Sequence, residues 1–115
     1  MKVSFEGIGK EVMTFLVSDA ASMKEGCGVA LSGNGEVKAA DSNAPFAGIC
    51  LHSSGDFAAV QTRGVVTCGY SGSSVPTVGY GKLAAAEQGV TVHANGREYL
   101  VLAVDTGAKT VTFVL

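Results

Sequence analysis

Two histidines are the side chains of this chain best suited to acid–base or metal chemistry. His52 and His93 could each act as a base or as a metal ligand. They stand far apart in the sequence, at the ends of expected strands, and no carboxylate lies near either one at the spacing that a metal site or a catalytic triad requires. We therefore expect both histidines to be solvent-facing residues at strand ends.

Three cysteines, Cys27, Cys50 and Cys68, could form a zinc site together with a histidine. Their number is odd, no CxxC pair is present, and the spacing is not that of a small disulfide-rich protein. Each lies in an apolar stretch that is typical of a strand. We predict small, buried core residues with reduced thiols, as in a cytosolic protein.

Short glycine motifs provide the remaining candidates for chemistry. The stretches 7–10 (Gly-Ile-Gly-Lys) and 79–82 (Gly-Tyr-Gly-Lys) resemble fragments of phosphate-binding loops but lack the GxxxxGK[ST] spacing. The stretch 69–73 (Gly-Tyr-Ser-Gly-Ser) falls short of the GxSxG motif of serine hydrolases. Asp41, Asp56 and Asp105 adjoin turns, where their side chains can cap local amides. We therefore expect no catalytic residue, no cofactor and no metal.

Some arginine and aromatic side chains are candidates for contact with a partner protein. Arg63 and Arg97 lie on or beside strands in a chain with few charges, so each is either an intersubunit ion-pair partner or part of a solvated strand face. Tyr70 and Tyr80 bracket a long loop, which they either pin to its own barrel or extend toward a partner. The full set of candidate contact residues is Phe5, Ile8, Phe15, Arg63, Tyr70, Tyr80 and Arg97.

Composition narrows the possible partners. The 115 residues include 8 basic and 10 acidic side chains, so the formal net charge is −2 and no basic surface is available for nucleic acid or anionic lipid. Charges at Glu6, Lys10 and Glu11 interrupt any signal-peptide core, and no run reaches the roughly 20 apolar residues that span a bilayer. We expect an unexported, soluble protein. Because 47% of the residues are hydrophobic, other subunits are expected to cover part of its surface.

Short apolar runs separated by glycine-rich turns predict β-structure throughout. The clearest hairpin joins 28–32 to 36–40 through Gly33-Asn34-Gly35. Residues 20–25 could form one helical turn, 82–88 either a strand or a single turn, and 69–81 the most mobile loop. Further strands are expected at 12–17, 46–52, 57–68 (with a bulge or close packing at Gly64), 90–93, 98–104 and 109–115.

A weak internal duplication organises these strands. The pattern of hairpin, apolar run, turn and second apolar run occurs at 28–62 and again about 53 positions later at 81–115. Because a few short strands cannot bury their apolar faces alone, we expect the two copies to share one core. The predicted fold is a mainly β single domain over 12–115, a β-barrel or β-sandwich of about 8–9 short strands with at most one or two helical turns, preceded by an extended arm at 1–11.

The order of these elements resembles the small head decoration, or capsid cement, proteins of tailed bacteriophages and prophages. The resemblance covers about residues 12–115. It is carried by low-specificity glycine and valine patterns, namely Cys27-Gly-Val-Ala-Leu-Ser with the Gly33-Asn-Gly turn, Phe46-Ala-Gly-Ile, Val60-Gln-Thr-Arg-Gly-Val-Val, Val101-Leu-Ala-Val-Asp and Val111-Thr-Phe-Val-Leu.

That family implies a compact, commonly trimeric β domain that sits on the outer face of an expanded capsid and ties neighbouring shell subunits together. An N-terminal segment, here Met1 to Glu11, often takes part in attachment, although this chain lacks the proline-rich arm of several family members. The implied partners are further copies of the chain and the major capsid protein, and the implied location is the virion, assembled in the bacterial cytoplasm. Strand 12–17 and the loop 69–81 are the expected seam or shell contacts.

Other functional classes remain open. A small enzyme would need a histidine to meet a carboxylate or cysteine in one pocket. A ligand- or carbohydrate-binding module would need a groove with exposed aromatic side chains, for which a chain with no tryptophan, three tyrosines and five phenylalanines offers little. Another virion component, in a tail or fibre, is a further alternative.

Overall fold

The computed structural model describes residues 8–115, which form ten β-strands and no helix. The mainly β prediction is therefore confirmed, while residues 20–25 form turns in place of the expected helical turn. Within the described range no helix is long and apolar enough to cross a membrane. The strands are β1 (Glu11–Val17), β2 (Gly28–Gly33), β3 (Glu36–Ala39), β4 (Gly48–Ser54), β5 (Phe57–Arg63), β6 (Val65–Ser71), β7 (Gly79–Ala85), β8 (Val90–Val92), β9 (Arg97–Asp105) and β10 (Thr110–Val114).

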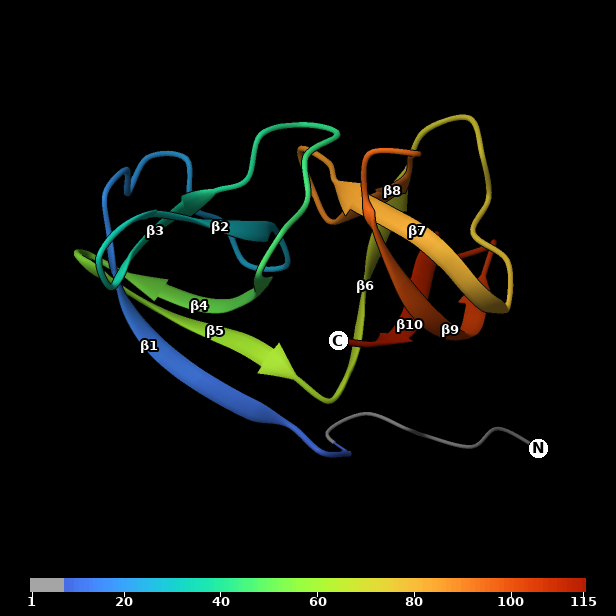
Figure 1. Cartoon of the computed structure of the whole chain (residues 1–115), viewed down its shortest axis with the longest axis horizontal. Helices are drawn as coiled ribbons and strands as arrows, with labels where there is room; N and C mark the ends of the chain where they lie inside the picture. Colours follow the sequence, from blue (N-terminus) through green and yellow to red (C-terminus); the bar gives the residue numbers. More distant parts are fainter. Residues whose placement is uncertain (1–7) are drawn as a thin grey trace.

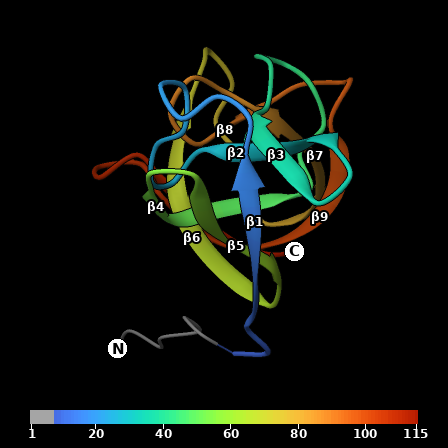
Figure 2. The same cartoon turned by 90° about the vertical axis from the view of Figure 1, so that its left-hand side faces the viewer.

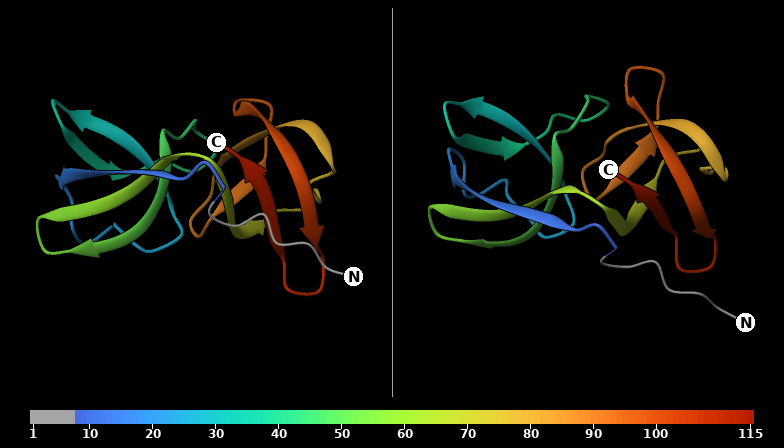
Figure 3. Two further views of the ribbon diagram at one scale, coloured as in Figure 1. Left: turned by 90° about the horizontal axis from the view of Figure 1, so that it is seen from below. Right: turned by 60° about the horizontal axis from the view of Figure 1, so that its bottom comes forward.

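The strands close into two small barrels that lie side by side (Figures 1 and 3). Barrel 1 has the strand order β1-β3-β2-β4-β5, and barrel 2 has the order β10-β6-β8-β7-β9. Each contains one parallel pair, β1 with β3 and β6 with β8, and its other pairs are antiparallel. Closure leaves each five-stranded sheet without a long open edge.

The two barrels repeat the same strand register. In barrel 1, Thr14 of β1 lies opposite Ala59 of β5, and in barrel 2, Thr67 of β6 lies opposite Thr112 of β10. Both members of the second pair stand 53 residues beyond those of the first, the same separation as between Phe46 and Tyr99. The structural repeat thus begins with β1 and β6, one strand earlier than the sequence pattern at 28 and 81.

Gly64 divides the segment 57–68, which the sequence predicted as one strand with a bulge. Its φ of +90° is unfavourable for residues with a side chain, and it lies between the end of β5 in barrel 1 and the start of β6 in barrel 2. A Cβ at Gly64 would lie 2.5 Å from the carbonyl carbon of Gly9. Only glycine therefore fits where the chain passes from one barrel to the other.

Backbone and side-chain hydrogen bonds fasten this crossover. The amide of Val65 donates to the carbonyl of Ile8 at 2.9 Å. The Gln61 side chain is only 2% exposed, and its Nε2 donates to the carbonyl oxygens of Arg63 and Val65 at 3.1 and 3.0 Å. One buried amide therefore bridges the two residues that flank Gly64.

Each barrel has its own apolar cluster, but the two clusters do not divide at the crossover. The cluster of barrel 1 consists of Met23, Cys27, Val29, Val37, Cys50, Ala58 and Val60. The cluster of barrel 2 includes Phe46 and Ile49 from the first half of the chain. The segment before β4 also pairs with β7, since Asn43 donates to the Ala85 carbonyl and the Ala85 amide donates to Ala44, each at 2.8 Å. The barrels therefore form a single domain.

Candidate functional site

His52 meets a carboxylate that the sequence did not place near it. Its Nδ1 lies 3.4 Å from Oε1 of Glu25, a residue 27 positions away that the fold brings beside β4. The two side chains are 68% and 70% exposed, so solvent screens this pair. Within residues 8–115 there is no group of three or more His, Cys, Asp or Glu side chains that could hold a metal ion, and the His52–Glu25 pair belongs to no larger group of this kind.

His93 and Asp105 serve local turns. The Nδ1 of His93 accepts a hydrogen bond from the amide of Asn95 at 3.1 Å. The Oδ1 of Asp105 accepts the amides of Gly107 and Ala108, both at 3.0 Å. The expected capping role is confirmed for Asp105, whose side chain holds the β9–β10 turn.

All three cysteines are buried and free, as predicted. Cys27 and Cys50 are neighbours, since the amide of Cys50 donates to the Cys27 carbonyl at 3.0 Å. Burial, with smaller contributions from Cys27 and Glu25, raises the pKa of the Cys50 thiol to about 11. Burial raises the pKa of Cys68 to about 12. Thiols held in the protonated form are poor nucleophiles and poor metal ligands.

An open cleft of about 710 Å³ is lined by residues from both halves of the chain. Its side chains include Lys24, Glu25, Tyr70, Glu87 and Gln88. Every buried polar side-chain atom within residues 8–115 has a hydrogen-bond partner in the protein. The charged side chains that line the cleft, those of Lys24, Glu25 and Glu87, are exposed to solvent.

Of the seven candidate contact residues, Phe5 lies outside the described residues. Ile8 is 58% exposed, and its carbonyl oxygen binds Val65. Phe15 is half-buried and packs against the core of barrel 1. Tyr70 is buried in the core of barrel 2, so its side chain cannot provide the surface contact expected of it. It faces inward because β6 alternates there and its cross-strand neighbour Val90 is also a core residue.

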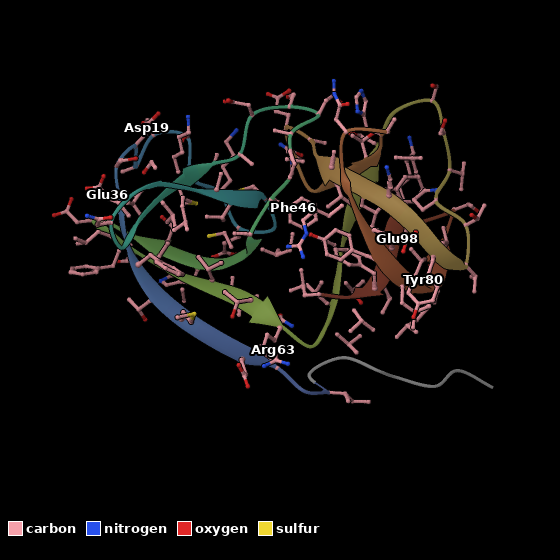
Figure 4. The ribbon with its side chains drawn as sticks, viewed as in Figure 1. Asp19, Glu36, Phe46, Arg63, Tyr80 and Glu98 are labelled. Carbon is pink, nitrogen blue, oxygen red and sulfur yellow. The ribbon has the colours of Figure 1, made fainter. Side chains whose placement is uncertain are left out.

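The other three candidates are exposed. Arg63 lies at the end of β5, opposite Glu11 of β1 (Figure 4). Tyr80, on β7, is 74% exposed. The Arg97 guanidinium lies 5.8 Å from the ring centroid of Tyr99. Burial raises the pKa of the Tyr99 hydroxyl, and Arg97 opposes that effect. Arg97 therefore has an intramolecular role in a cation–π contact.

An exposed apolar surface on barrel 1 was only partly anticipated. Ala58 and Val60 of β5 face the core, so the alternating residues Phe57 and Ala59 face outward. Leu16 lies directly opposite Phe57, and Val12 lies on the same side of β1 (Figure 2 looks onto this strand). Val12 and Leu16 are each 45% exposed and Phe57 is 55% exposed. Thr14 lies between Val12 and Leu16 on the same side and directly opposite Ala59. We call Val12, Thr14, Leu16, Phe57 and Ala59 the β1–β5 face.

Phe57 was missed because its exposure depends on register. The run from Phe57 was interpreted as one long strand, and nothing in it separates the core side from the solvent side. Pairing with β1 and β4 fixes this alternation, since a shift by one residue would exchange the two sides. The only available signal was an aromatic residue directly after the turn at 53–56.

Exposed apolar side chains also lie on barrel 2. Val75 and Val78 of the β6–β7 segment are 51% and 70% exposed, and Tyr80 follows on β7. A small hollow of about 60 Å³ beside them is lined by Val75, Pro76, Lys82 and Val92, among others.

Comparison with known proteins identifies no relative: no protein-family model matches the chain, and no curated protein matches it significantly. The class of protein is therefore described by its fold and its exposed surface. The described residues form a small all-β domain of two joined five-stranded barrels, with exposed apolar side chains on both barrels and an open polar cleft.

Proposed function

We propose that the chain is a non-enzymatic structural protein that decorates the outer surface of tailed-bacteriophage capsids as an oligomer. The observation that carries this proposal is the β1–β5 face, which presents the large apolar side chains of Val12, Leu16 and Phe57 to solvent on a closed β scaffold. Exposed apolar surfaces of this kind mark sites of protein association. The resemblance of residues 12–115 to capsid cement proteins supplies the partner class.

The disposition of the polar groups supports a role without chemistry. Gln61 fastens the crossover, the Tyr99 hydroxyl donates to the Phe46 carbonyl at 3.3 Å, and Asp105 caps a turn. Each of these side chains maintains the fold. The exposed His52–Glu25 pair lacks the desolvated surroundings in which acid–base catalysis is efficient.

The proposed partners are further copies of the chain, most simply three, and the major capsid protein of the shell. Assembly takes place in the bacterial cytoplasm and the mature protein resides in the virion. Many copies on one shell allow weak individual contacts to give stable attachment through avidity.

The proposed attachment arm must be shorter than residues 1–11, because residues 8–11 contact the folded domain. Ile8 binds Val65 and Gly9 packs against Gly64, while Glu11 already belongs to β1. Deleting residues 1–11 would therefore disturb the fold as well as any arm. A deletion of residues 2–7, which includes Phe5, isolates the contribution of the arm.

The proposal predicts that a gene for a major capsid protein lies beside the gene for this chain, and it is tested with heads assembled from that capsid protein. We expect the full-length chain to co-sediment with expanded heads, and the variant lacking residues 2–7 to remain folded by circular dichroism but to lose binding at least about tenfold. Absence of a capsid gene nearby, or failure of the full-length chain to bind heads at any concentration, would refute decoration. Unchanged binding by the deletion variant would refute the arm.

A ligand- or carbohydrate-binding module is the alternative favoured by the 710 Å³ cleft. Its aromatic residue, Tyr70, is only 6% exposed and offers little ring surface for stacking on a sugar. A titration with neutral oligosaccharides, followed by amide shifts at Lys24, Gln88 and Gly89, separates the two functions. Saturable shifts confined to those residues would favour the binding module over decoration or over another virion role in a tail or fibre.

A further inference from the structure

Two of the buried cysteines lie opposite each other where the chain enters β2. The register of β2 with β4 pairs Gly28 with Ile49, and one residue earlier the same register brings the two cysteines, Cys27 and Cys50, together. The amide of Cys50 donates to the Cys27 carbonyl at 3.0 Å, and the Cys50 carbonyl accepts the amide of Gly26 at 2.7 Å. Since Gly26 has a φ of +83°, it and Cys27 together oppose Cys50 as in a G1 β-bulge.

The two thiols also point to the same side. Cys27 precedes Val29 by two residues, and both side chains pack with Cys50 in the core cluster of barrel 1. Residues directly opposite each other in an antiparallel pair have Cα atoms about 4.5–5.5 Å apart. Disulfides bridge Cα separations of about 4.4–6.8 Å, so the backbone holds both cysteines within the range that a disulfide spans.

This pair lies at the shortest antiparallel seam of barrel 1. Only Gly28 and Val29 of β2 are in register with β4. The corresponding seam of barrel 2 joins β7 to β9, continues from Gly79 to Leu83 and carries no cysteine. A covalent link between β2 and β4 would therefore reinforce barrel 1 where its antiparallel pairing is least extensive.

A hollow of about 360 Å³ gives access to one of the two thiols. Cys27 is among its lining residues, whereas Cys50 is not. The lining also includes the exposed residues Lys24, Asp41 and Ser42, so the hollow is open to solvent. A small reagent that enters it meets Cys27 first.

We infer that Cys27 and Cys50 form a reversible disulfide within the folded chain when a small-molecule disulfide is supplied as the oxidant. The Cys27 thiolate attacks one sulfur of the oxidant, which forms a mixed disulfide and releases one small thiol. The Cys50 thiolate then attacks the sulfur of Cys27, and the second small thiol leaves. Two protons and two electrons pass from the cysteines to the oxidant, and an excess of small thiol reverses both steps.

The second step is slow near neutral pH. Exchange requires the thiolate, and burial, with smaller contributions from Cys27 and Glu25, raises the pKa of the Cys50 thiol to about 11. Below that pKa the thiolate fraction rises roughly tenfold for each pH unit. Closure of the bond should therefore become faster as the pH is raised from 7 to 9.

The bond also has a use in a capsid protein, and this use alone rests on the proposed function. The bacterial cytoplasm keeps thiols reduced during assembly, whereas a particle released from the cell meets oxidising surroundings. The disulfide then fastens the β2–β4 seam at the stage when the particle must persist outside the cell.

Peptide mapping tests which cysteines are linked. Trypsin separates the three cysteines into the peptides 25–38, 39–63 and 64–82. The reduced full-length chain is incubated in its folded state with oxidised glutathione at pH 8, free thiols are alkylated, and the non-reduced digest is analysed by mass spectrometry. A second sample is oxidised in concentrated urea.

We expect the folded chain to link 25–38 to 39–63 and to leave Cys68 free, because Cys68 packs in the cluster of barrel 2 with neither of the other cysteines. In urea, loop closure alone favours Cys50 with Cys68, the pair closer in sequence. A folded chain that keeps all three thiols free, that links two copies, or that gives the same pattern as the unfolded chain overturns the inference.

Thermal unfolding tests whether the bond stabilises the fold. In a Cys68→Ala variant, oxidation should raise the melting temperature by at least about 5 °C, because the link restricts the unfolded chain. A Cys27→Ala, Cys68→Ala variant is the matched control and should not respond to the oxidant. An unchanged or lower melting temperature in the linked Cys68→Ala variant overturns the stabilising role. Head binding is measured separately, so failure of decoration leaves the disulfide intact, and the reverse.

Discussion

Phe46 and Tyr99, which hold corresponding positions in the two halves of the chain, stack on each other with ring centroids 5.3 Å apart and planes inclined by 15°. Phe113 packs against the edge of Phe46 at 6.3 Å. The strands β2 and β7, which also correspond, are in contact. Contact between equivalent residues also occurs in isologous pairs of subunits, but here the packing is one-sided. Phe46 and Ile49 pack in the core of barrel 2, whereas the described core cluster of barrel 1 contains residues of the first half alone.

Phe46→Ala should cost about 3–5 kcal/mol of unfolding free energy, because it removes a fully buried ring from the core of barrel 2. Phe57→Ala provides the matched control, since the same side chain is 55% exposed there. We expect that change to stay within about 0.5 kcal/mol. Urea unfolding at a dilute protein concentration measures both. Equal losses would contradict the assignment of Phe46 to the core.

A left-handed backbone conformation by itself costs a residue with a side chain about 1–2 kcal/mol. We expect Gly64→Ala to lower the free energy of unfolding by more than this. The added methyl group would meet the backbone of Gly9 and Lys10, which cannot move aside without disturbing β1. Gly26→Ala is the control, since Gly26 has a φ of +83° but nothing within 4 Å of a Cβ. Similar losses for the two variants, measured by chemical unfolding, would mean that the crossover is not closely packed.

Gln61→Leu should leave two carbonyl oxygens, the part-buried one of Arg63 and the buried one of Val65, without the side-chain amide that now donates to both. An unsatisfied buried acceptor costs about 1–3 kcal/mol. Gln88→Leu, on the exposed rim of the cleft, tests the same chemical change without lost bonds and should be near neutral. Amide hydrogen exchange at Val65 and Val66 should quicken in Gln61→Leu alone, and unchanged exchange there would argue against the bridging role.

The two buried thiols should make stability fall above pH 9. Their pKa values are about 11 and 12 in the folded chain against 9.0 in an unperturbed thiol, so between these values the folded state holds more protons than the unfolded state. Stability is unaffected well below pH 9 and decreases as pH rises, by about 3 kcal/mol at pH 10 for the pair together. Urea unfolding at pH 7, 8 and 10 in the presence of reductant measures the loss.

A Cys50→Ala, Cys68→Ala variant supplies the control for this pH dependence. It should be less stable at pH 7, because two core side chains are truncated. Its further loss between pH 8 and pH 10 should be smaller than that of the wild type. If both proteins lose the same amount, other groups are responsible for the alkaline instability.

Much of the fold followed from local patterns. The Asn34-Gly35 turn was predictable because a tight hairpin needs positive φ, and Gly35 has a φ of +68°. Alternating or continuous apolar runs located eight strand segments, and the buried cysteines followed from their apolar surroundings. These features depend on a few neighbouring residues, which the sequence shows directly.

The rest depended on contacts between distant segments. The run 57–68 has the same β-forming composition on both sides of Gly64, so only the approach of Gly9 reveals that two barrels separate there. Phe46 precedes a strand of barrel 1 yet packs in barrel 2, and Glu25 reaches His52 only through the folding of β2 against β4. The outward direction of Phe57 required the register with β1. Local periodicity carries no information about such pairings.

The packing of Phe46 and Ile49 in the other half has a consequence for synthesis. A nascent chain released from the ribosome only as far as Arg63 has every strand of barrel 1 but lacks most of the core side chains that pack around these two residues, such as Val66, Tyr99 and Phe113. We therefore expect the packing around Phe46 to be completed only after β10, the last strand, has emerged, so that this ring stays exposed to solvent during most of synthesis.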